Sequence, residues 1–119
     1  GTVVMTDTSL VLVLTTMAAD ADTSLLVDAL IAERLAACVG VVPGMVSTYW
    51  WEGRVERANE QQLVIKTTAD RVDALSARVR SLHPYDVPEL MVIPVADADP
   101  RYASWLRSAV SATTPDLAG

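Results

Sequence analysis

The feature that most constrains the fold is a pair of apolar, β-branched segments on either side of a two-residue turn signal. The first segment spans residues 38–51, the second spans residues 55–68, and Glu52-Gly53 stands between them. This pattern predicts a β-hairpin. Each arm holds ~14 residues, or roughly 45 Å, whereas a typical strand has ~5–6 residues. Pro43-Gly44 leaves an alternative open, because these residues can mark a bulge or divide the first arm into two ordinary strands.

A hairpin of this length is longer than the rest of a 119-residue chain can cover. Its tip is therefore expected to expose Tyr49, Trp50 and Trp51 beside backbone edges that can pair with another chain. Neighbouring strand residues point to opposite faces, so one of the two tryptophans can pack inward while the other meets a partner. We therefore expect an obligate homo-oligomer.

The remaining segments alternate between strand and helix patterns. In chain order we expect a buried central strand over 10–14, a helix that begins near Asp20–Thr23 and runs to Ala37, the hairpin, a helix from Asp70 to Leu82, a short buried strand over 90–93, and a final helix from Asp99-Pro100 to Val110. This order predicts an α+β fold, a ferredoxin-like split βαβ sandwich (βαββαβ) with an added C-terminal helix. Residues 1–119 form one domain in this interpretation, and about 1–8 and 111–119 are expected to fray.

Composition and motifs exclude several classes of function. The net charge is −6 with only nine scattered Lys and Arg residues, which argues against a nucleic-acid partner. No apolar stretch reaches the ~18 residues of a membrane span, and no secretory signal pattern opens the chain, so we expect a cytoplasmic protein without a membrane partner. A single cysteine, Cys38, allows no intrachain disulfide. Nucleophile elbows, glycine-rich phosphate loops and His-Glu-x-x-His motifs do not occur, so we expect no enzyme.

Four motifs together carry a resemblance to a known family. They are Glu33-Arg34-Leu35-Ala36-Ala37-Cys38-Val39, Tyr49-Trp50-Trp51, Ile65-Lys66-Thr67-Thr68 and His83-Pro84-Tyr85-Asp86-Val87-Pro88-Glu89. In this order and spacing the chain resembles the CutA divalent-cation tolerance family, from about Ser9 to Val110. The resemblance implies a homotrimer of ferredoxin-like subunits joined through edge strands and the 38–68 hairpin. It also implies an association with copper or another divalent cation. Gly40 and Asp86 depart from the family pattern, which often has Asn and Glu there.

Cys38 and His83 are, besides four methionines, the only soft or borderline metal ligands in the chain. A copper or zinc site must therefore draw on them, with a carboxylate such as Glu89 or residues of a symmetry mate completing it. Each residue also has a structural interpretation. Cys38 can be a small buried apolar residue, and His83 can hydrogen-bond the last carbonyl groups of the preceding helix.

A second candidate site is a small-ligand pocket. Lys66 lies in an apolar strand end, where its charge needs a partner, and Glu89 at the start of the last strand is the expected one. If those two strand ends lie at the same edge of the sheet, Lys66, His83, Tyr85 and Glu89 converge. The family motifs point to the same four residues, with Trp51 arriving from a neighbouring subunit. The structural alternative is an ion pair beside a proline-stiffened turn.

The sequence therefore predicts a trimeric divalent-metal-binding protein, with copper as the first candidate, that serves metal homeostasis. A trimeric small-ligand sensor that uses an intersubunit pocket is the first alternative, and a structural assembly module is the second.

Overall fold

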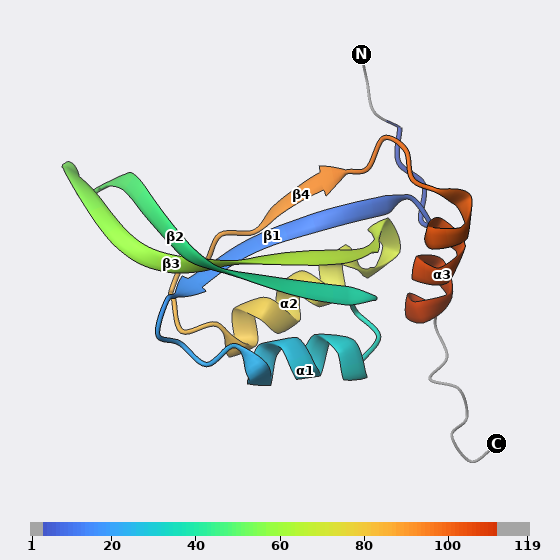
Figure 1. Cartoon of the computed structure of the whole chain (residues 1–119), viewed down its shortest axis with the longest axis horizontal. Coiled ribbons are helices and arrows are strands. Elements are labelled where there is room, and N and C mark those ends of the chain that lie inside the picture. Colours follow the sequence, from blue (N-terminus) through green and yellow to red (C-terminus); the bar gives the residue numbers. More distant parts are fainter. Residues whose placement is uncertain (1–3, 112–119) are drawn as a thin grey trace.

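The computed structural model describes residues 4–111, which form four strands and three α-helices (Figure 1). In chain order the elements are β1 (Leu10–Ala18), α1 (Ser24–Ala32), β2 (Cys38–Trp51), β3 (Arg54–Thr68), the 3₁₀ turn η1 (Ala69–Arg71), α2 (Val72–Leu82), β4 (Met91–Pro94) and α3 (Pro100–Val110). The predicted order of strands and helices is confirmed, and the chain is an α+β protein. None of the helices within residues 4–111 is both long and apolar enough to cross a membrane.

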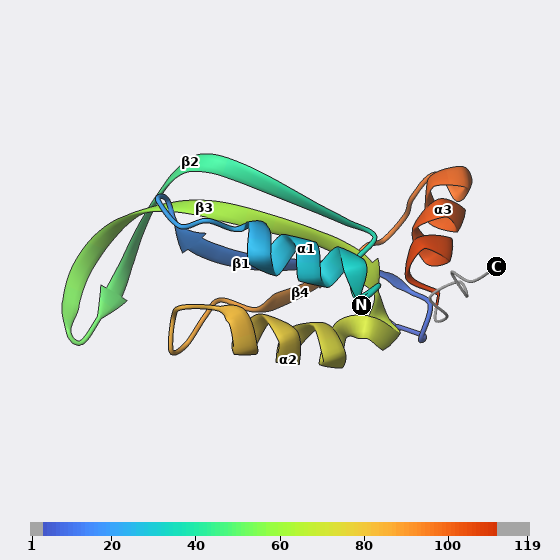
Figure 2. The same cartoon turned by 90° about the horizontal axis from the view of Figure 1, so that it is seen from below.

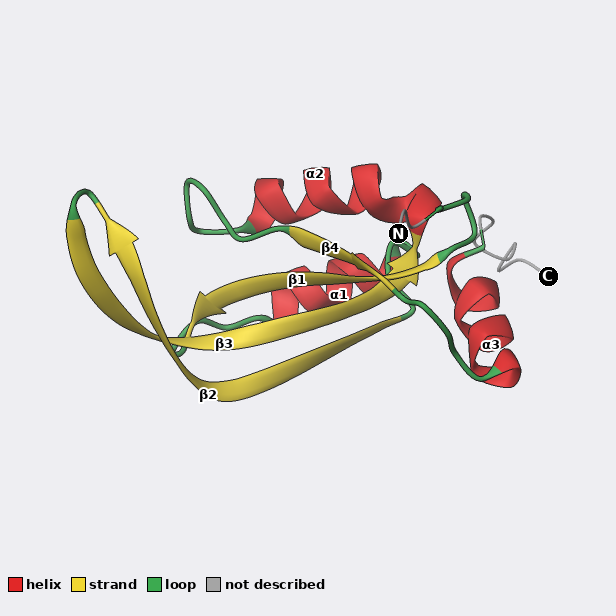
Figure 3. Cartoon of the chain, turned by 90° about the horizontal axis from the view of Figure 1, so that it is seen from above, coloured by secondary structure: helices red, strands yellow, loops and turns green. Residues whose placement is uncertain are grey.

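The four strands form one antiparallel sheet in the order β2-β3-β1-β4 (Figure 3). The predicted central position of β1 is confirmed, since β1 pairs with β3 on one side and with β4 on the other. The long strand β2 and the short strand β4 are the two edges of the sheet. Among residues 4–111 each edge strand has only one neighbouring strand and therefore leaves one row of backbone groups without a strand partner.

The main core lies between the sheet and two helices. Figure 2 shows this helix layer from below, with both helices running along the strands, α1 in front of β1 and α2 on the side of β4. Alternate residues of the central strands, such as Val13 and Ile65, are completely buried against Leu30 of α1 and Leu75 of α2. At the far end of the sheet α3 packs against Leu10 and makes a smaller second cluster.

The hairpin has the length that its sequence predicts. Glu52 and Gly53 both have positive φ, 50° and 76°, as expected for a tight hairpin turn whose twist matches that of the strands. Pro43 and Gly44 produce a bulge, because the pairing with β3 shifts by one residue between Val42 and Met45. The bulge interpretation is therefore correct, and β2 continues beyond it to the tip. The outer part of the hairpin extends past the rest of the domain (Figure 1).

Two predicted boundaries are wrong. Helix α1 ends at Ala32 rather than Ala37, because Arg34 adopts a left-handed conformation (φ 57°) that turns the chain back toward the sheet. The apolar residues Leu35 and Ala36 are buried, but they lie beyond this turn and lead into β2. Strand β1 continues past Leu14 to Ala18, because residues 15–18, which begin with two threonines, also pair with β3.

Strand β4 is also exposed rather than buried as predicted. Met91, Val92 and Ile93 are 54%, 39% and 38% exposed. The reason is that β4 is a short edge strand that pairs only with β1. Its apolar run therefore lies on the surface of a single chain.

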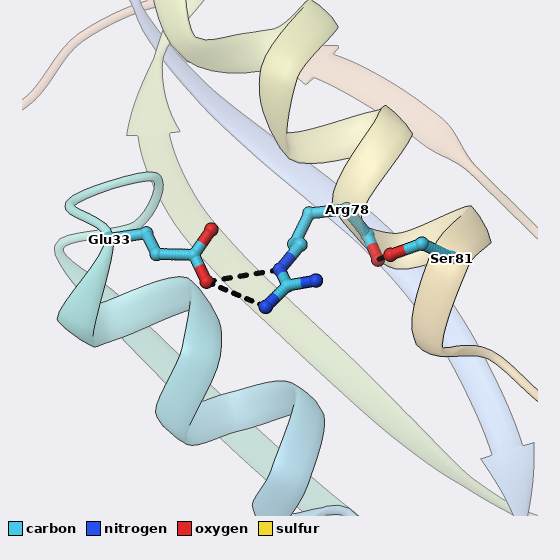
Figure 4. A network of polar contacts seen from close by, with 3 residues as sticks. All are labelled: Glu33, Arg78 and Ser81. Carbon is cyan, nitrogen blue, oxygen red and sulfur yellow. Dashed lines mark hydrogen bonds and ion pairs between the residues drawn. The ribbon is translucent and has the colours of Figure 1, made fainter.

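Polar side-chain contacts connect helices and loops at the periphery of the domain. Arg78 of α2 donates from Nε (3.0 Å) and Nη2 (2.9 Å) to Glu33 Oε2, just past the end of α1 (Figure 4). Both side chains are more than a third exposed, so the pair contributes little stability, about 0.2–1 kcal/mol. Before β1, Thr8 O accepts a hydrogen bond of 2.9 Å from Arg107 Nε of α3. Of the residues predicted to fray, 1–8 and 111–119, those at 1–3 and 112–119 lie outside the described residues, whereas Asp7 O accepts a hydrogen bond of 2.9 Å from the Asp70 backbone N–H.

Candidate functional site

A cavity of about 430 Å³ lies where the hairpin meets the loop between α2 and β4. Figure 3 shows the outer hairpin bending toward this loop. Strands β1, β2 and β3 contribute Thr16, Tyr49, Trp51 and Glu60, and the loop contributes Tyr85, Asp86, Val87 and Glu89. The cavity thus contains three of the residues predicted for a ligand pocket, namely Trp51, Tyr85 and Glu89, all from the same chain.

His83 fixes the loop that carries Tyr85. It ends α2 in an extended conformation (φ −82°, ψ 135°), as expected for the residue before Pro84. Its buried ring donates from Nε2 to Thr16 O (2.6 Å) and accepts at Nδ1 from the Tyr85 backbone N–H (3.0 Å). Because a carbonyl only accepts and a backbone N–H only donates, this network assigns the ring hydrogen to Nε2. Both ring nitrogens are therefore engaged within the chain, and His83 lies behind the cavity wall.

Tyr85 and Glu60 form the inner wall of the cavity. The Tyr85 hydroxyl donates to Glu60 Oε2 over 3.1 Å. Burial raises the pKa of the Tyr85 phenol, and the hydrogen bond to Glu60 and its negative charge raise this pKa further. Tyr85 is therefore held as a neutral hydrogen-bond donor. Glu60 itself is only 7% exposed.

Glu89 occupies another side of the cavity and is oriented by Gln62 of β3. The Gln62 amide donates from Nε2 to Glu89 Oε2 (3.1 Å) and to Thr15 O (2.6 Å). This side-chain amide ties the first residues of the segment before β4 to the centre of the sheet. Glu89 is therefore positioned by β3 as well as by its own loop.

Lys66 does not join this cluster, and the predicted Lys66–Glu89 pair is wrong. The Lys66 ammonium donates to Tyr102 Oη of α3 over 3.2 Å and lies 5.6 Å from the centre of that ring. This hydrogen bond is the main cause of the raised pKa of Lys66. Strands β3 and β4 are each antiparallel to β1 and hence parallel to each other, so the end of β3 and the start of β4 lie at opposite ends of the sheet.

Cys38, His83 and Glu89 are likewise separated in one chain. Cys38 is half-buried and lies opposite Lys66 in the hairpin register. Lys66 is four residues along β3 from Gln62, roughly 13 Å at ~3.3 Å per residue, and Gln62 is the residue that binds Glu89. Across residues 4–111, no group of three or more His, Cys, Asp or Glu side chains is close enough to hold a metal ion. A centre built on all three predicted ligands therefore requires residues of more than one chain.

Comparison with known proteins identifies the family. A family model described as CutA1 divalent ion tolerance protein matches residues 11–109, which include nearly all of the sheet and helices. This chain belongs to the CutA1 divalent ion tolerance family. The resemblance noted in its motifs is therefore confirmed.

Individual CutA proteins show the same relationship. The divalent-cation tolerance protein CutA of Escherichia coli is 41% identical over 104 residues, which cover 87% of this chain and 93% of that protein. The chloroplastic protein CutA 1 of rice (Oryza sativa) is 45% identical over 83 residues, 70% of this chain but 47% of the rice protein. The chain thus matches about half the length of the rice relative.

Solved CutA structures share the fold. The crystal structure of CutA1 from Oryza sativa superposes with a TM-score of 0.82 at 37% identity, covering 89% of this chain and 99% of that one. A structure from Archaeoglobus fulgidus, named a periplasmic divalent cation tolerance protein CutA, has a TM-score of 0.80 at 26% identity and covers 85% and 98% of the two chains. CutA relatives therefore carry names that assign them to different compartments.

Several residues of the cavity were missed by sequence reasoning, namely Thr16, Tyr49, Glu60, Asp86 and Val87. Glu60 and Gln61 are buried, although they belong to the polar run 59–62. One signal of their burial was available in the sequence. The run stands directly before the apolar residues that begin at Leu63, so its last members had to enter the sheet.

Proposed function

We propose that this chain acts in the tolerance of divalent cations, with copper as the first candidate, as a cytoplasmic homotrimer without catalytic activity. The observation that carries the proposal is the family match over residues 11–109. Relatives that are similar over most of their length, such as that of Escherichia coli, bear the name divalent-cation tolerance protein. The order and antiparallel pairing of the strands also support the ferredoxin-like sandwich of the subunit.

The exposed surface supports assembly. The edge strand β2 exposes Val46 (62%) and Trp50 (75%), and the opposite edge strand β4 exposes Met91 (54%). Apolar side chains beside unpaired backbone are typical of surfaces that pair with another chain. Contact between two different surfaces of identical chains is head-to-tail and closes into a ring when the rotation permits. Three is the number of chains that the resemblance to the CutA family implies.

Assembly also determines where a metal would bind. In one chain the thiol of Cys38 and the ring of His83 are apart, and both His83 nitrogens already hold hydrogen bonds. These single-chain donors do not fit a preformed copper centre. A site that uses Cys38, His83 and Glu89 therefore belongs to the contact between subunits, where different chains supply different ligands, and it requires His83 to exchange one of its two hydrogen bonds for the metal.

The test is titration calorimetry of the purified oligomer with Cu(II), with Cu(I) under reducing conditions and with Zn(II), alongside its mass by light scattering. We expect a three-chain mass and saturable copper binding at one ion per chain or one per trimer. Cys38→Ala and His83→Ala should abolish this binding, while Cys38→Ala keeps the trimer mass. A trimer that binds none of the three ions saturably would refute the metal role.

The cavity favours a second candidate function, that of a small-ligand sensor. Its walls combine aromatic faces with carboxylates, and its volume of about 430 Å³ falls within the range of about 300–1,000 Å³ that is usual for small-ligand pockets. A sensor should tolerate Cys38→Ala and lose ligand binding when Tyr85 or Glu89 is changed.

A further inference from the structure

We propose that the cavity lined by Glu60, Tyr85, Glu89 and Trp51 binds a small organic ammonium ion, a short alkyl amine whose N–H groups donate to the carboxylates. The inference rests on the second candidate function and names its class of ligand. The cavity shares Glu89 with the proposed metal site, but neither Cys38 nor His83 is among its lining residues, so amine binding does not require copper.

The charge of the lining selects cations. Three carboxylates, those of Glu60, Asp86 and Glu89, line the cavity, and Lys, Arg and His are absent from its described lining. Within residues 4–111 the ion pairs are Arg54–Glu56 and Arg78–Glu33, so Glu60 and Glu89 have no basic partner there. A concave site with charges of one sign attracts ligands of the opposite sign.

Glu60 is the most buried of the three carboxylates. Its side chain belongs to a residue more than nine-tenths buried, and its Oε2 accepts from the Tyr85 hydroxyl. Its second oxygen, Oε1, receives no hydrogen bond from residues 4–111 and is not enclosed by them, so it is accessible to a ligand in the cavity. An alkylammonium group offers three N–H donors and a positive charge, which suit this open carboxylate oxygen.

The aromatic walls favour an organic cation over a metal ion. Tyr49, Trp51 and Tyr85 line the cavity together with the carboxylates. Aromatic faces attract ammonium groups within about 6 Å and pack against methylene groups. A divalent ion instead needs several oxygen ligands at about 2.0–2.6 Å, and residues 4–111 of one chain hold no such group of acidic side chains.

Putrescine, an unbranched diamine, is the probe, titrated calorimetrically into the full-length oligomer in an amine-free phosphate buffer. The diol of the same length tests the charge, and tetramethylammonium, a cation without N–H groups, tests the hydrogen bonds. We expect saturable binding of putrescine and affinities at least about tenfold weaker for the diol and for tetramethylammonium. No saturable binding of putrescine, or equal binding of either comparison compound, would overturn the proposal.

Matched variants locate the site. Glu60→Gln keeps the shape of the side chain and should weaken putrescine binding at least about tenfold, whereas Glu56→Gln on the same strand should leave it unchanged. Trp51→Leu should weaken it roughly fivefold, whereas Trp50→Leu, on the opposite face of the strand, should not. If Glu60→Gln fails to fold, Glu89→Gln decides, with the same loss expected.

If Glu56→Gln lost as much putrescine affinity as the pocket variants, the binding would reflect general attraction to an acidic surface. This outcome would refute the proposed site. Titration with copper distinguishes the pocket proposal from the proposed metal role. Putrescine binding without copper binding would leave the pocket proposal standing and refute the metal role, and copper binding without putrescine binding would do the reverse.

Discussion

The two halves of β3 belong to one strand but have different environments. All of residues 60–68 pair with β1 and most of them also pair with β2, and Leu63 and Ile65 are completely buried under the helices. Residues 54–59 pair only with β2, and Val55 is 53% exposed. A two-stranded ribbon is marginally stable by itself in water. The comparison shows that the domain core explains the inner half, whereas the outer half needs contacts from beyond one chain.

The largest expected effect comes from truncating one apolar residue in each half. Leu63→Ala removes a fully buried side chain from the core and should lower the free energy of unfolding by about 2–5 kcal/mol. Val55→Ala removes an exposed side chain and should change the stability of the subunit by less than about 0.5 kcal/mol. Urea unfolding of both variants at equal protein concentration measures the difference. Equal losses would mean that the outer half is as much a part of the core as the inner half.

The sequence predicted the elements well because the patterns that form them are local. The Glu52-Gly53 turn, the end of α2 at Leu82 before His83-Pro84 and the start of α3 at Asp99-Pro100 each depend on the conformational preferences of a few residues. The end of α1 was misplaced because Leu35 is buried at a helical interval but beyond a left-handed turn at Arg34. The burial of an apolar residue at a helical interval therefore does not show whether the residue belongs to the helix or follows the turn that ends it.

The candidate site depended on long-range placement and was predicted only in part. Trp51, Tyr85 and Glu89, which were assigned to one ligand pocket, line the same cavity, although Trp51 comes from the same chain rather than from a neighbouring subunit. Lys66 was misplaced because the relative direction of β3 and β4 was assigned wrongly. Glu60 was missed because its burial depends on a loop 25 residues further along the chain. These errors concern contacts that no local pattern specifies.

A substitution at the tip of the hairpin tests whether the outer half of β3 opens independently of the inner half. Gly53 has φ 76°, so Gly53→Ala forces a left-handed conformation that costs about 1–2 kcal/mol for an L-residue. Hydrogen exchange of the backbone amides in residues 45–59 should accelerate about 5–30-fold, with the amides of Leu63 and Ile65 unchanged. Gly40→Ala is the control, because a Cβ at Gly40 would meet Val64 O at an ordinary 4.0 Å. Acceleration of the same amides in Gly40→Ala would contradict the assignment of strain to the turn.

The smallest expected effect comes from a substitution at the boundary between the two halves of β3. There, Glu60 is the first buried residue of the strand and accepts a hydrogen bond from the Tyr85 hydroxyl. Tyr85→Phe removes this hydrogen bond and should lower the free energy of unfolding by about 0.5–1.5 kcal/mol at neutral pH. Because the pKa of Tyr85 is raised in the folded chain, the unfolded chain loses its phenol proton first as the pH rises beyond about 10. The wild-type protein therefore loses stability in that range relative to Tyr85→Phe, and the difference between them should shrink. Urea unfolding of both proteins at about pH 8 and about pH 11 measures this difference. A difference that stays constant or grows with pH would show that the folded boundary does not hold Tyr85 as a neutral donor to Glu60.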